Sequence, residues 1–370
     1  MDSLIVKVMV VFLIIGAVDK LLGNRFGYGQ RFEDGFRAMG PLVISMAGLL
    51  SLSPVLANLI APVAAPLLAL IGADPSVAAA SVLAIDMGGY PLAVELAQHP
   101  DAGQFSGVLL GTMMGATLSF TIPVALGILR REDREPLATG ILIGLSTIPI
   151  GCLIGGVVAG FAWKMMLLNL VPVTLFAALI VFGLWKRPAK MVACFLVFGR
   201  IIEIVALIGL VLAILSALLG IELIDGLKPL SEGLLLAGQI AVILAGAFPL
   251  VHFLTTVFRK PLLLIGSRLG IGETSTAGLI TSLANCLPMF AMLHAMDRRG
   301  KILNISFAVS GAFVFGGQFA FVAGVSPEML VPMIAGKLGG GVAALLVAMW
   351  FLRGMREGEQ EGEKEGGKST

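Results

Sequence analysis

Residues 74–93, DPSVAAASVLAIDMGGYPLA, form the stretch around which the rest of the chain is organised. Asp74 suits the N-cap of a helix and Pro75 its first position, because a capping side chain and a fixed φ both favour helix initiation. Mostly apolar residues follow as far as Ile85. The stretch therefore predicts an apolar helix that begins with Asp74 as its cap.

The same helix is expected to break at its centre, where Asp86 is followed by Gly88, Gly89 and Pro91. Glycine removes side-chain packing, and Pro91 has no N–H to donate to the carbonyl of Met87. Loosened backbone beside a carboxylate is costly in hydrocarbon unless both line a cavity enclosed by protein. This combination is typical of a transporter site near the bilayer midplane, and it predicts that Asp86 binds a small cation.

The composition indicates an all-α polytopic membrane protein. Of 370 residues, 58% are hydrophobic and 13% charged, and the mean hydropathy is +1.00, whereas a soluble domain carries about 25% charged residues. The 25 Lys and Arg nearly balance the 23 Asp and Glu, so net charge does not indicate nucleic-acid binding. The three cysteines lie in apolar segments and the three histidines have no ligand spacing, so we expect neither disulfides nor a metal site, and no cofactor.

Apolar segments divide the chain into thirteen candidate membrane helices, of which 11–13 are expected to cross. They cover residues 3–21, 36–53, 55–72, 76–97, 104–129, 136–161, 163–185, 192–219, 231–256, 257–269, 273–296, 302–324 and 327–352. The third carries Pro62 and Pro66, and the tenth is short. Each of these two is alternatively a re-entrant or interfacial segment.

The placement of basic residues tests this count. If all thirteen segments cross, nineteen Lys and Arg fall on one side of the membrane and three on the other, and omitting the third and tenth segments scrambles this partition. The positive-inside rule therefore favours thirteen crossings of the cytoplasmic membrane, with the N-terminus outside and the C-terminus in the cytoplasm. Residues 354–370 are rich in Glu, Gly and Lys and predict a disordered cytoplasmic tail.

A weak internal repeat agrees with that parity. A shift of 198 residues aligns Gly35 with Gly233 and Gly72 with Gly270. The first and eighth segments would enter the membrane from opposite sides, so we expect two inverted repeats of six segments. The predicted units are a first repeat at 1–161, a linker helix and loop at 162–191, and a second repeat at 192–353.

The repeat predicts a second broken helix opposite the first. Residues 272–291, GETSTAGLITSLANCLPMFA, occupy the equivalent place, with Asn285 near the centre and Pro288 leaving the carbonyl of Ala284 without its donor. The fourth and eleventh segments would then meet across a pseudo-twofold axis. This layout is similar to the sodium/proton antiporter architecture, as an analogy of fold alone.

Residues 16–48, GAVDKLLGNRFGYGQRFEDGFRAMGPLVISMAG, together with AIDMGGYPL at 84–92, resemble the ethanolamine-utilisation transporter family (EutH, ethanolamine permease). The resemblance runs along nearly the whole chain, and its blocks are long enough to be specific. It implies uptake of ethanolamine across the cytoplasmic membrane to supply an ethanolamine ammonia-lyase pathway. Composition and periodicity do not by themselves indicate this substrate.

Asp86 is the leading candidate for substrate binding. Ethanolamine is an ammonium ion at neutral pH, and a buried carboxylate is its natural counter-charge. The alternative is a structural ion pair, for instance with Lys337 in the thirteenth segment. Tyr90 lies one helical turn further on and offers its ring or hydroxyl to the ammonium, with an interfacial aromatic anchor as the alternative.

Polar residues at similar depth complete the predicted site. Asn285 is a candidate for binding the substrate hydroxyl, and Ser119 and Gln318 for lining the site, although such residues more often bridge membrane helices. Arg200 and Glu203, at i and i+3, are expected to neutralise each other, with proton coupling through Glu203 as the alternative. Together with Lys337, they are the candidates for coupling or gating.

Three classes of function remain open at this point. The first is a transporter or facilitator for ethanolamine that works by alternating access at Asp86. The second is a cation/proton antiporter, which would need more buried acids than Asp86 and Glu203 provide. The third is a membrane enzyme, which would need a second catalytic acid, a metal cluster or an activated nucleophile near Asp86, and we expect no enzymatic activity.

Stripes of glycine at 107, 111 and 115 and at 336 and 340 indicate close helix packing in a mobile bundle or a homodimer.

Overall fold

The computed structural model describes residues 4–221, 223–257 and 270–366, and within these ranges it contains helices and no strands. Seven of the helices described there are long and apolar enough to cross a membrane. The chain is therefore a multi-pass membrane protein. The first helices in chain order are α1 (Leu4–Leu21), α2 (Tyr28–Arg37), α3 (Met39–Leu42), the π-helical η1 (Val43–Ala47) and α4 (Gly48–Ala69).

The remaining elements fall into two further groups. The middle of the chain contains α5 (Ser76–Val82), η2 (Ile85–Gly89), α6 (Tyr90–Leu96), α7 (Pro100–Gln104), η3 (Phe105–Gly115), η4 (Thr117–Thr121), α8 (Ile122–Ile128), η5 (Arg131–Asp133), α9 (Arg134–Val158), α10 (Trp163–Lys186), α11 (Pro188–Leu219) and α12 (Leu230–Val257). The C-terminal part contains α14 (Glu273–Ser282), α15 (Cys286–Met292), η6 (Leu293–Ala295), α16 (Arg298–Gly311), α17 (Gly317–Val325), η7 (Pro327–Met329) and α18 (Leu330–Gly366).

Residues Tyr28–Ala69 form one helix of 42 residues. We expected the second and third segments to be separate, with a boundary at residue 54, and this expectation is wrong. The helix contains three prolines, but each removes only one backbone donor, which membrane helices tolerate. Two glycines let this helix pack closely on α12 and α11. A Cβ on Gly35 would lie 2.3 Å from the backbone N of Ala245 in α12, and one on Gly48 would lie 1.9 Å from the carbonyl O of Ala206 in α11.

Helices α5 and α6 form a re-entrant hairpin. Asp74, just before α5, accepts hydrogen bonds through Oδ2 from the backbone N–H groups of Gln98 (3.0 Å) and His99 (3.2 Å), just after α6. The two ends of the stretch are therefore in contact, and its centre is the tip. The chain is interrupted in this stretch, as expected, but it returns to the side from which it entered rather than crossing as a broken helix.

The backbone of residues 83–88 produces this reversal. Leu83 and Ala84 are extended, and Gly88 has a φ of 84°, which is a left-handed conformation that glycine adopts without strain. Pro91 follows in the first turn of α6, where its missing N–H would have no partner in any case. The proline therefore begins the returning helix and does not break the incoming one.

Helices α14 and α15 form a second re-entrant hairpin. Ser275 on α14 donates through Oγ to Oδ1 of Asp297 (3.3 Å), which lies beyond α15, so the ends of this stretch also meet. The tip is formed by Leu283, Ala284 and Asn285, and Asn285 caps α15 by accepting from the backbone N–H of Leu287 at 2.9 Å. The eleventh segment, like the fourth, is a hairpin and not a broken crossing helix.

Each hairpin tip crosses a membrane helix at a glycine. A Cβ on Gly115 of η3 would lie 1.9 Å from the carbonyl O of Leu83, and one on Gly316 would lie 1.9 Å from that of Ala284. At the second crossing, the helix made by α16 and α17 is itself interrupted between Gly311 and Gly317. The N–H groups of Phe313 and Phe315 there donate to the carbonyls of Ser282 and Leu283, both at 2.9 Å. The sequence did not predict this third interruption.

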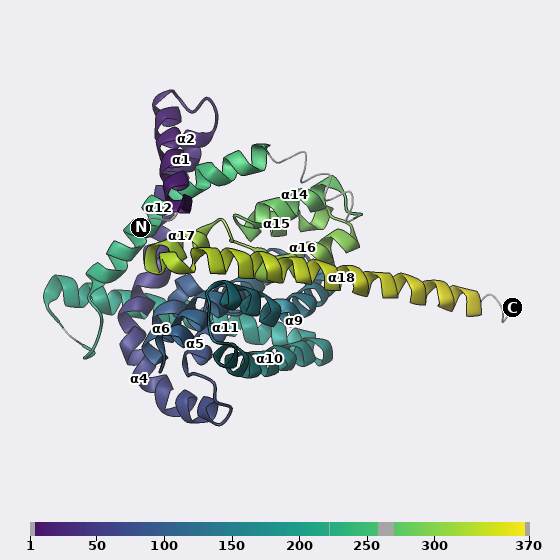
Figure 1. The fold of residues 1–370 in the computed structure, drawn as a ribbon, viewed down its shortest axis with the longest axis horizontal. Coiled ribbons are helices and arrows are strands. Elements are labelled where there is room, and N and C mark those ends of the chain that lie inside the picture. The colour runs from purple at the N-terminus through teal and green to yellow at the C-terminus, as the bar shows by residue number, and fades with distance from the viewer. Residues whose placement is uncertain (1–3, 222, 258–269, 367–370) are drawn as a thin grey trace.

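Three sets of elements pack closely in the described residues. Helices α9, α16 and α18 pack against one another, and the hairpin α5–α6 packs on η3, while α1 and α2 pack on α12 (Figure 1).

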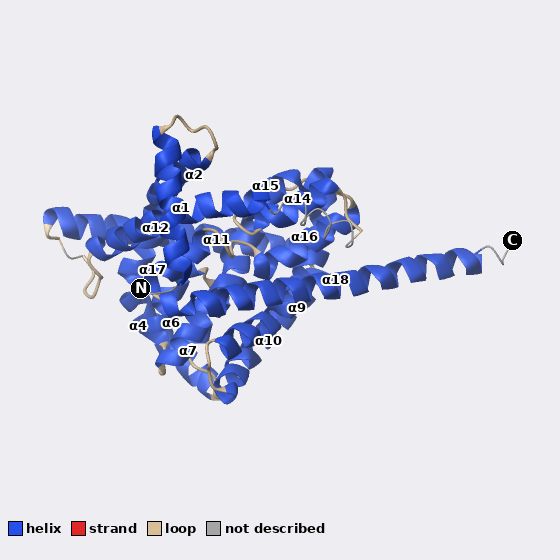
Figure 2. Ribbon diagram, turned by 45° about the horizontal axis from the view of Figure 1, so that its top comes forward, coloured by secondary structure: helices blue, strands red, loops and turns tan. Residues whose placement is uncertain are grey.

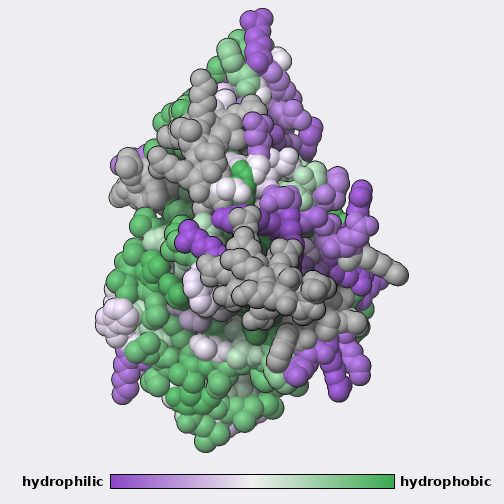
Figure 3. Space-filling model, turned by 90° about the vertical axis from the view of Figure 1, so that its right-hand side faces the viewer, coloured by the Kyte–Doolittle hydropathy of each residue, from purple (hydrophilic) through white to green (hydrophobic). Residues whose placement is uncertain are grey.

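Helix α18 leaves the body and projects beyond it (Figure 2). Residues 354–366, which we expected to be disordered, are helical in the structure, and their Glu, Gln, Arg and Lys residues are good helix formers. On the side from which α18 projects, hydrophobic residues cover the lower surface and hydrophilic residues gather on the right (Figure 3).

The tenth segment, at 257–269, lies almost entirely outside the described residues.

The re-entrant hairpin predicts that both of its ends can be reached from one side of the membrane. Ile71→Cys and Gln98→Cys, at two exposed positions just outside the hairpin and made singly in a cysteine-free chain, should both react with an impermeant thiol reagent from the same side. A crossing helix would place them on opposite sides, and labelling from opposite sides would contradict the hairpin. Labelling of intact cells and of inverted vesicles, compared in parallel, measures this.

Candidate functional site

A cavity of about 790 Å³ lies where the two hairpin tips meet. Its volume is within the range of small-molecule sites. The tips contribute Ala84 and Asp86 from the first hairpin and Ala284 and Asn285 from the second. Its other walls come from the long helix Tyr28–Ala69, the helix that contains η3 and η4, α12, and the first turn of α17.

Asp86 presents to this cavity a carboxylate that no other described residue partners. In the described part of the chain it forms no ion pair, and no other residue donates a hydrogen bond to its side chain. The suggested ion pair with Lys337 is absent from the structure, because Lys337 Nζ instead donates to the carbonyl of Thr112 at 2.8 Å. An isolated carboxylate in a low-dielectric wall requires a counter-charge, and a cationic guest would supply it.

Two amide side chains share the cavity with Asp86. Gln318, at the start of α17, is 4% exposed, and its Oε1 is buried without a hydrogen-bond partner in the described residues. Asn285 uses Oδ1 to cap α15, which leaves its Nδ2 as a donor. A buried acceptor without a partner lowers the stability of the fold unless a ligand or a water molecule donates a hydrogen bond to it. The cavity thus combines a negative charge, an acceptor and a donor.

Two predicted site residues are not among those that line the cavity. Tyr90 accepts from Gln104 Nε2 at 3.3 Å, and its ring packs edge-on against Phe321 with centroids 6.0 Å apart. Ser119 accepts from the N–H of Ala84 at 2.8 Å and donates to the carbonyl of Gly115 at 2.8 Å. Ser119 therefore holds the hairpin tip in place, and the structure gives it no role in lining the cavity.

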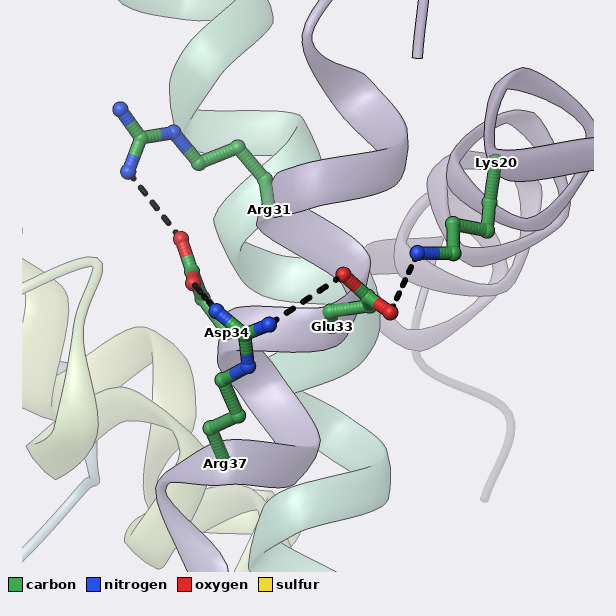
Figure 4. A network of polar contacts seen from close by, with 5 residues as sticks. All are labelled: Lys20, Arg31, Glu33, Asp34 and Arg37. Atoms are coloured by element: carbon green, nitrogen blue, oxygen red, sulfur yellow. Dashed lines mark hydrogen bonds and ion pairs between the residues drawn. The ribbon is translucent and has the colours of Figure 1, made fainter. Parts of the chain in front are cut away.

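The mouth of the cavity carries charged residues from α2. Arg31 and Asp34 line it, and Asp34 accepts from Arg31 at 3.3 Å and pairs with Arg37 at 3.7 Å. Glu33 extends the network to Lys20 and Arg37 (Figure 4). The predicted segments at 3–21 and 36–53 leave these charged residues in or beside the loop between them. What the sequence could not show is that α2 continues into the membrane helix and brings this cluster to the cavity.

Three further polar residues line the cavity that the sequence did not single out. Their only sequence signal is a polar side chain within an apolar helix. Ser45 of η1 and Thr281 of α14 line the cavity, as does His252 of α12. Among the described residues, no three His, Cys, Asp or Glu side chains lie close enough together to hold a metal ion.

The candidates for coupling lie in two different environments. Arg200 and Glu203 pair at 2.8 Å on the surface of α11, with side chains 71% and 67% exposed. They neutralise each other as expected, and neither of them lines the cavity. Lys337 is 1% exposed and lies inside the helix bundle.

The glycine stripes pack within the chain. Gly107, Gly111 and Gly115 face Tyr90, Ile85 and Leu83 of the first hairpin, and Gly336 faces Gly151 of α9. Small residues here let the hairpin lie directly on η3.

The comparisons with known proteins agree on one family. The model of the family described as "Ethanolamine utilisation protein, EutH" matches residues 1–351. The chain is 51% identical over 356 residues to the "Probable ethanolamine permease EutH" of Listeria monocytogenes, covering 96% of this chain and 95% of that protein. It is 52% identical to the "Uncharacterized protein YxeR" of Bacillus subtilis, covering 94% of each, and 41% identical to the "Probable ethanolamine permease EutH" of Salmonella typhimurium, covering 94% and 95%. No solved structure matches the chain.

The tight crossing at Gly115 predicts that a single methyl group will disturb the site. Gly115→Ala should displace the tip that carries Asp86 and destabilise the protein by about 1–3 kcal/mol, the usual effect of overpacking. The matched control is Gly127→Ala, where a Cβ meets nothing within 4 Å. Thermal unfolding in detergent measures both, and equal midpoints for the two variants would contradict the crossing.

Proposed function

Because the chain belongs to the EutH family of ethanolamine utilisation proteins, we propose that it transports ethanolamine, as the protonated amine, across the cytoplasmic membrane into the cell. The observation that carries this proposal is the carboxylate of Asp86, which pairs with no other described residue, in a cavity that also holds Gln318 Oε1, buried without a hydrogen-bond partner in the described part of the chain. A small cation with one hydroxyl group complements both.

Each polar group of ethanolamine has a counterpart in the cavity. The ammonium binds Asp86, where a charge-assisted hydrogen bond forms. The hydroxyl donates to Gln318 Oε1 and accepts from Asn285 Nδ2. The cavity is much larger than a molecule of four heavy atoms, so we propose that water shares it with the substrate and that this state is one open for exchange.

We propose a topology in which the hairpins enter from opposite sides. Within the described residues, the crossings on this path are α1, the helix Tyr28–Ala69, the helix Pro100–Ile128, α9, α10, α11, α12, the helix of α16 and α17, and α18. This path keeps the N-terminus outside and the C-terminus in the cytoplasm. Two ion pairs are consistent with it, because Lys301–Asp133 (2.6 Å) and Arg298–Glu135 (3.0 Å) join two regions that this path places in the cytoplasm.

The same topology preserves inverted repeats in a modified form. Helices α1 to α9 form one unit and α11 to α18 the other, with α10 as the linker, and each unit contains one re-entrant hairpin followed by the helix that its tip crosses. The cavity mouth at Arg31 and Asp34 then faces the cytoplasm. Alternating access moves the hairpins, with the helices that they cross, against a scaffold that includes α1 and α11. A homodimer would use the exposed face of α11, since the glycine stripes are occupied within the chain.

The competing cation/proton antiporter has less support. That function needs several acids close to the ion, and Glu203, the second acid considered, is paired with Arg200 on the protein surface. Asp86 is the one acidic side chain at the hairpin tips among the described cavity-lining residues, and Asp34 lies at the mouth. A single carboxylate with neighbouring amides fits a hydroxylated amine better than a bare ion exchanged for protons.

Removal of the Asp86 charge should abolish tight binding of ethanolamine. In proteoliposomes, Asp86→Asn should reduce ethanolamine uptake about 30-fold or more, because a hydrogen bond to a charged group contributes roughly 2–3 kcal/mol. Glu203→Gln is the matched control and should leave uptake unchanged. Labelled uptake measures both, and wild-type rates in Asp86→Asn and Asp86→Ala would remove Asp86 from the mechanism.

A further inference from the structure

An aromatic pair forms part of the cavity wall. Phe120 of η4 and Phe313, from the interruption between α16 and α17, line the same cavity as Asp86. Their ring centroids lie 5.7 Å apart and their ring planes are inclined at 77°, which is an edge-on arrangement. Neither residue is fully buried. An edge-on pair, unlike a stacked pair, leaves aromatic faces that the pair itself does not cover.

Phe313 has a backbone conformation that glycine would adopt more easily. Its φ is 61°, in the left-handed region, and among the described residues Asn24 is the other non-glycine residue with a positive φ. Asparagine tolerates this conformation, whereas a bulky side chain there is an outlier. Such strain is found where the site needs the side chain. The phenylalanine ring, and not the turn alone, is therefore what this position provides.

Hydrogen bonds hold both aromatic residues close to the hairpin tips. The N–H of Phe313 donates to the carbonyl of Ser282, directly before the second tip, at 2.9 Å. Ser119, the residue before Phe120, accepts from the N–H of Ala84 in the first tip at 2.8 Å. The two rings thus belong to the segments that fix the tips, and they share the cavity with the carboxylate that the first tip carries.

Aromatic faces and a carboxylate together recognise a wider class of cations than a carboxylate alone. A primary ammonium donates hydrogen bonds to the carboxylate. A fully methylated ammonium has no N–H to donate, and aromatic faces attract it through the charge on its methyl groups. The cavity of about 790 Å³ has room for these methyl groups, and Phe248 of α12 adds further apolar surface to its lining.

We propose that Phe120 and Phe313 form an aromatic wall that binds the ammonium group of the ligand, and that the site therefore also binds ethanolamines methylated on nitrogen, up to the quaternary ammonium choline. This inference rests on the proposed transport function and widens its substrate class. Asp86 supplies the counter-charge for every member of this class, and all of them carry the same hydroxyl group. Phe120 and Phe313 then determine how well the methylated ligands bind relative to ethanolamine.

Competition with labelled ethanolamine in proteoliposomes tests the aromatic wall. Choline should inhibit uptake by the wild type, whereas its neutral carbon analogue, in which a tert-butyl group replaces the trimethylammonium group, should not inhibit even at an about tenfold higher concentration. Phe120→Leu and Phe313→Leu should each weaken inhibition by choline about tenfold. The KM for ethanolamine should change less than about threefold, because its ammonium keeps its hydrogen bonds to Asp86.

Control variants separate the aromatic wall from general effects on the fold. Phe313→Tyr keeps an aromatic face and should retain inhibition by choline. Phe161→Leu removes one ring of another edge-on pair, whose centroids are 6.2 Å apart and which does not line the cavity, and it should change neither value. Thermal unfolding checks that each variant is folded.

Three results would overturn the aromatic wall. They are wild-type transport of ethanolamine that choline does not inhibit, unchanged inhibition by choline in both leucine variants, and an equal loss of ethanolamine and choline binding in the folded leucine variants. Absence of ethanolamine transport by the wild type would instead overturn the proposed function itself.

Discussion

The need to satisfy backbone polar groups inside a membrane governs this structure. A hairpin tip exposes N–H and C=O groups that no helix bonds, and lipid offers them no partner. Here the tips lie against other chain segments that supply these partners. The hydroxyl of Ser119 accepts from the N–H of Ala84, and the N–H groups of Phe313 and Phe315, in the turn between α16 and α17, donate to the carbonyls of Ser282 and Leu283 at the second tip. Glycines at both crossings allow the approach.

This arrangement explains why a carboxylate can lie at the tip. The turn that reverses the first hairpin places Asp86 two residues after the extended Ala84, at the edge of the cavity rather than in lipid. The second tip brings Asn285 to the same cavity, and the interruption between α16 and α17 brings Gln318. Three departures from regular helix therefore converge on one site, as expected where irregular backbone lines a cavity enclosed by protein.

The sequence predicted much of this from local chemistry and failed where the outcome depends on tertiary contacts. The interruptions near Asp86 and Asn285 followed from glycine and proline, and the helical membrane class from composition. The sequence did not distinguish a broken crossing helix from a hairpin, because that choice depends on contacts such as Asp74 with Gln98 and His99, between residues far apart in the chain. Tyr90 was placed on the face of Asp86 by assuming a continuous helix. The turn between them directs Tyr90 toward Gln104 and Phe321 instead.

The most direct test of this account is an experimental structure of the protein with ethanolamine bound, determined at a resolution that distinguishes the ligand from water. The account predicts the ligand between the two hairpin tips, with its nitrogen within hydrogen-bonding distance of the Asp86 carboxylate and its hydroxyl toward Gln318 and Asn285. A ligand bound elsewhere, or an Asp86 carboxylate paired with Lys337 and no ligand at the tips, would contradict it.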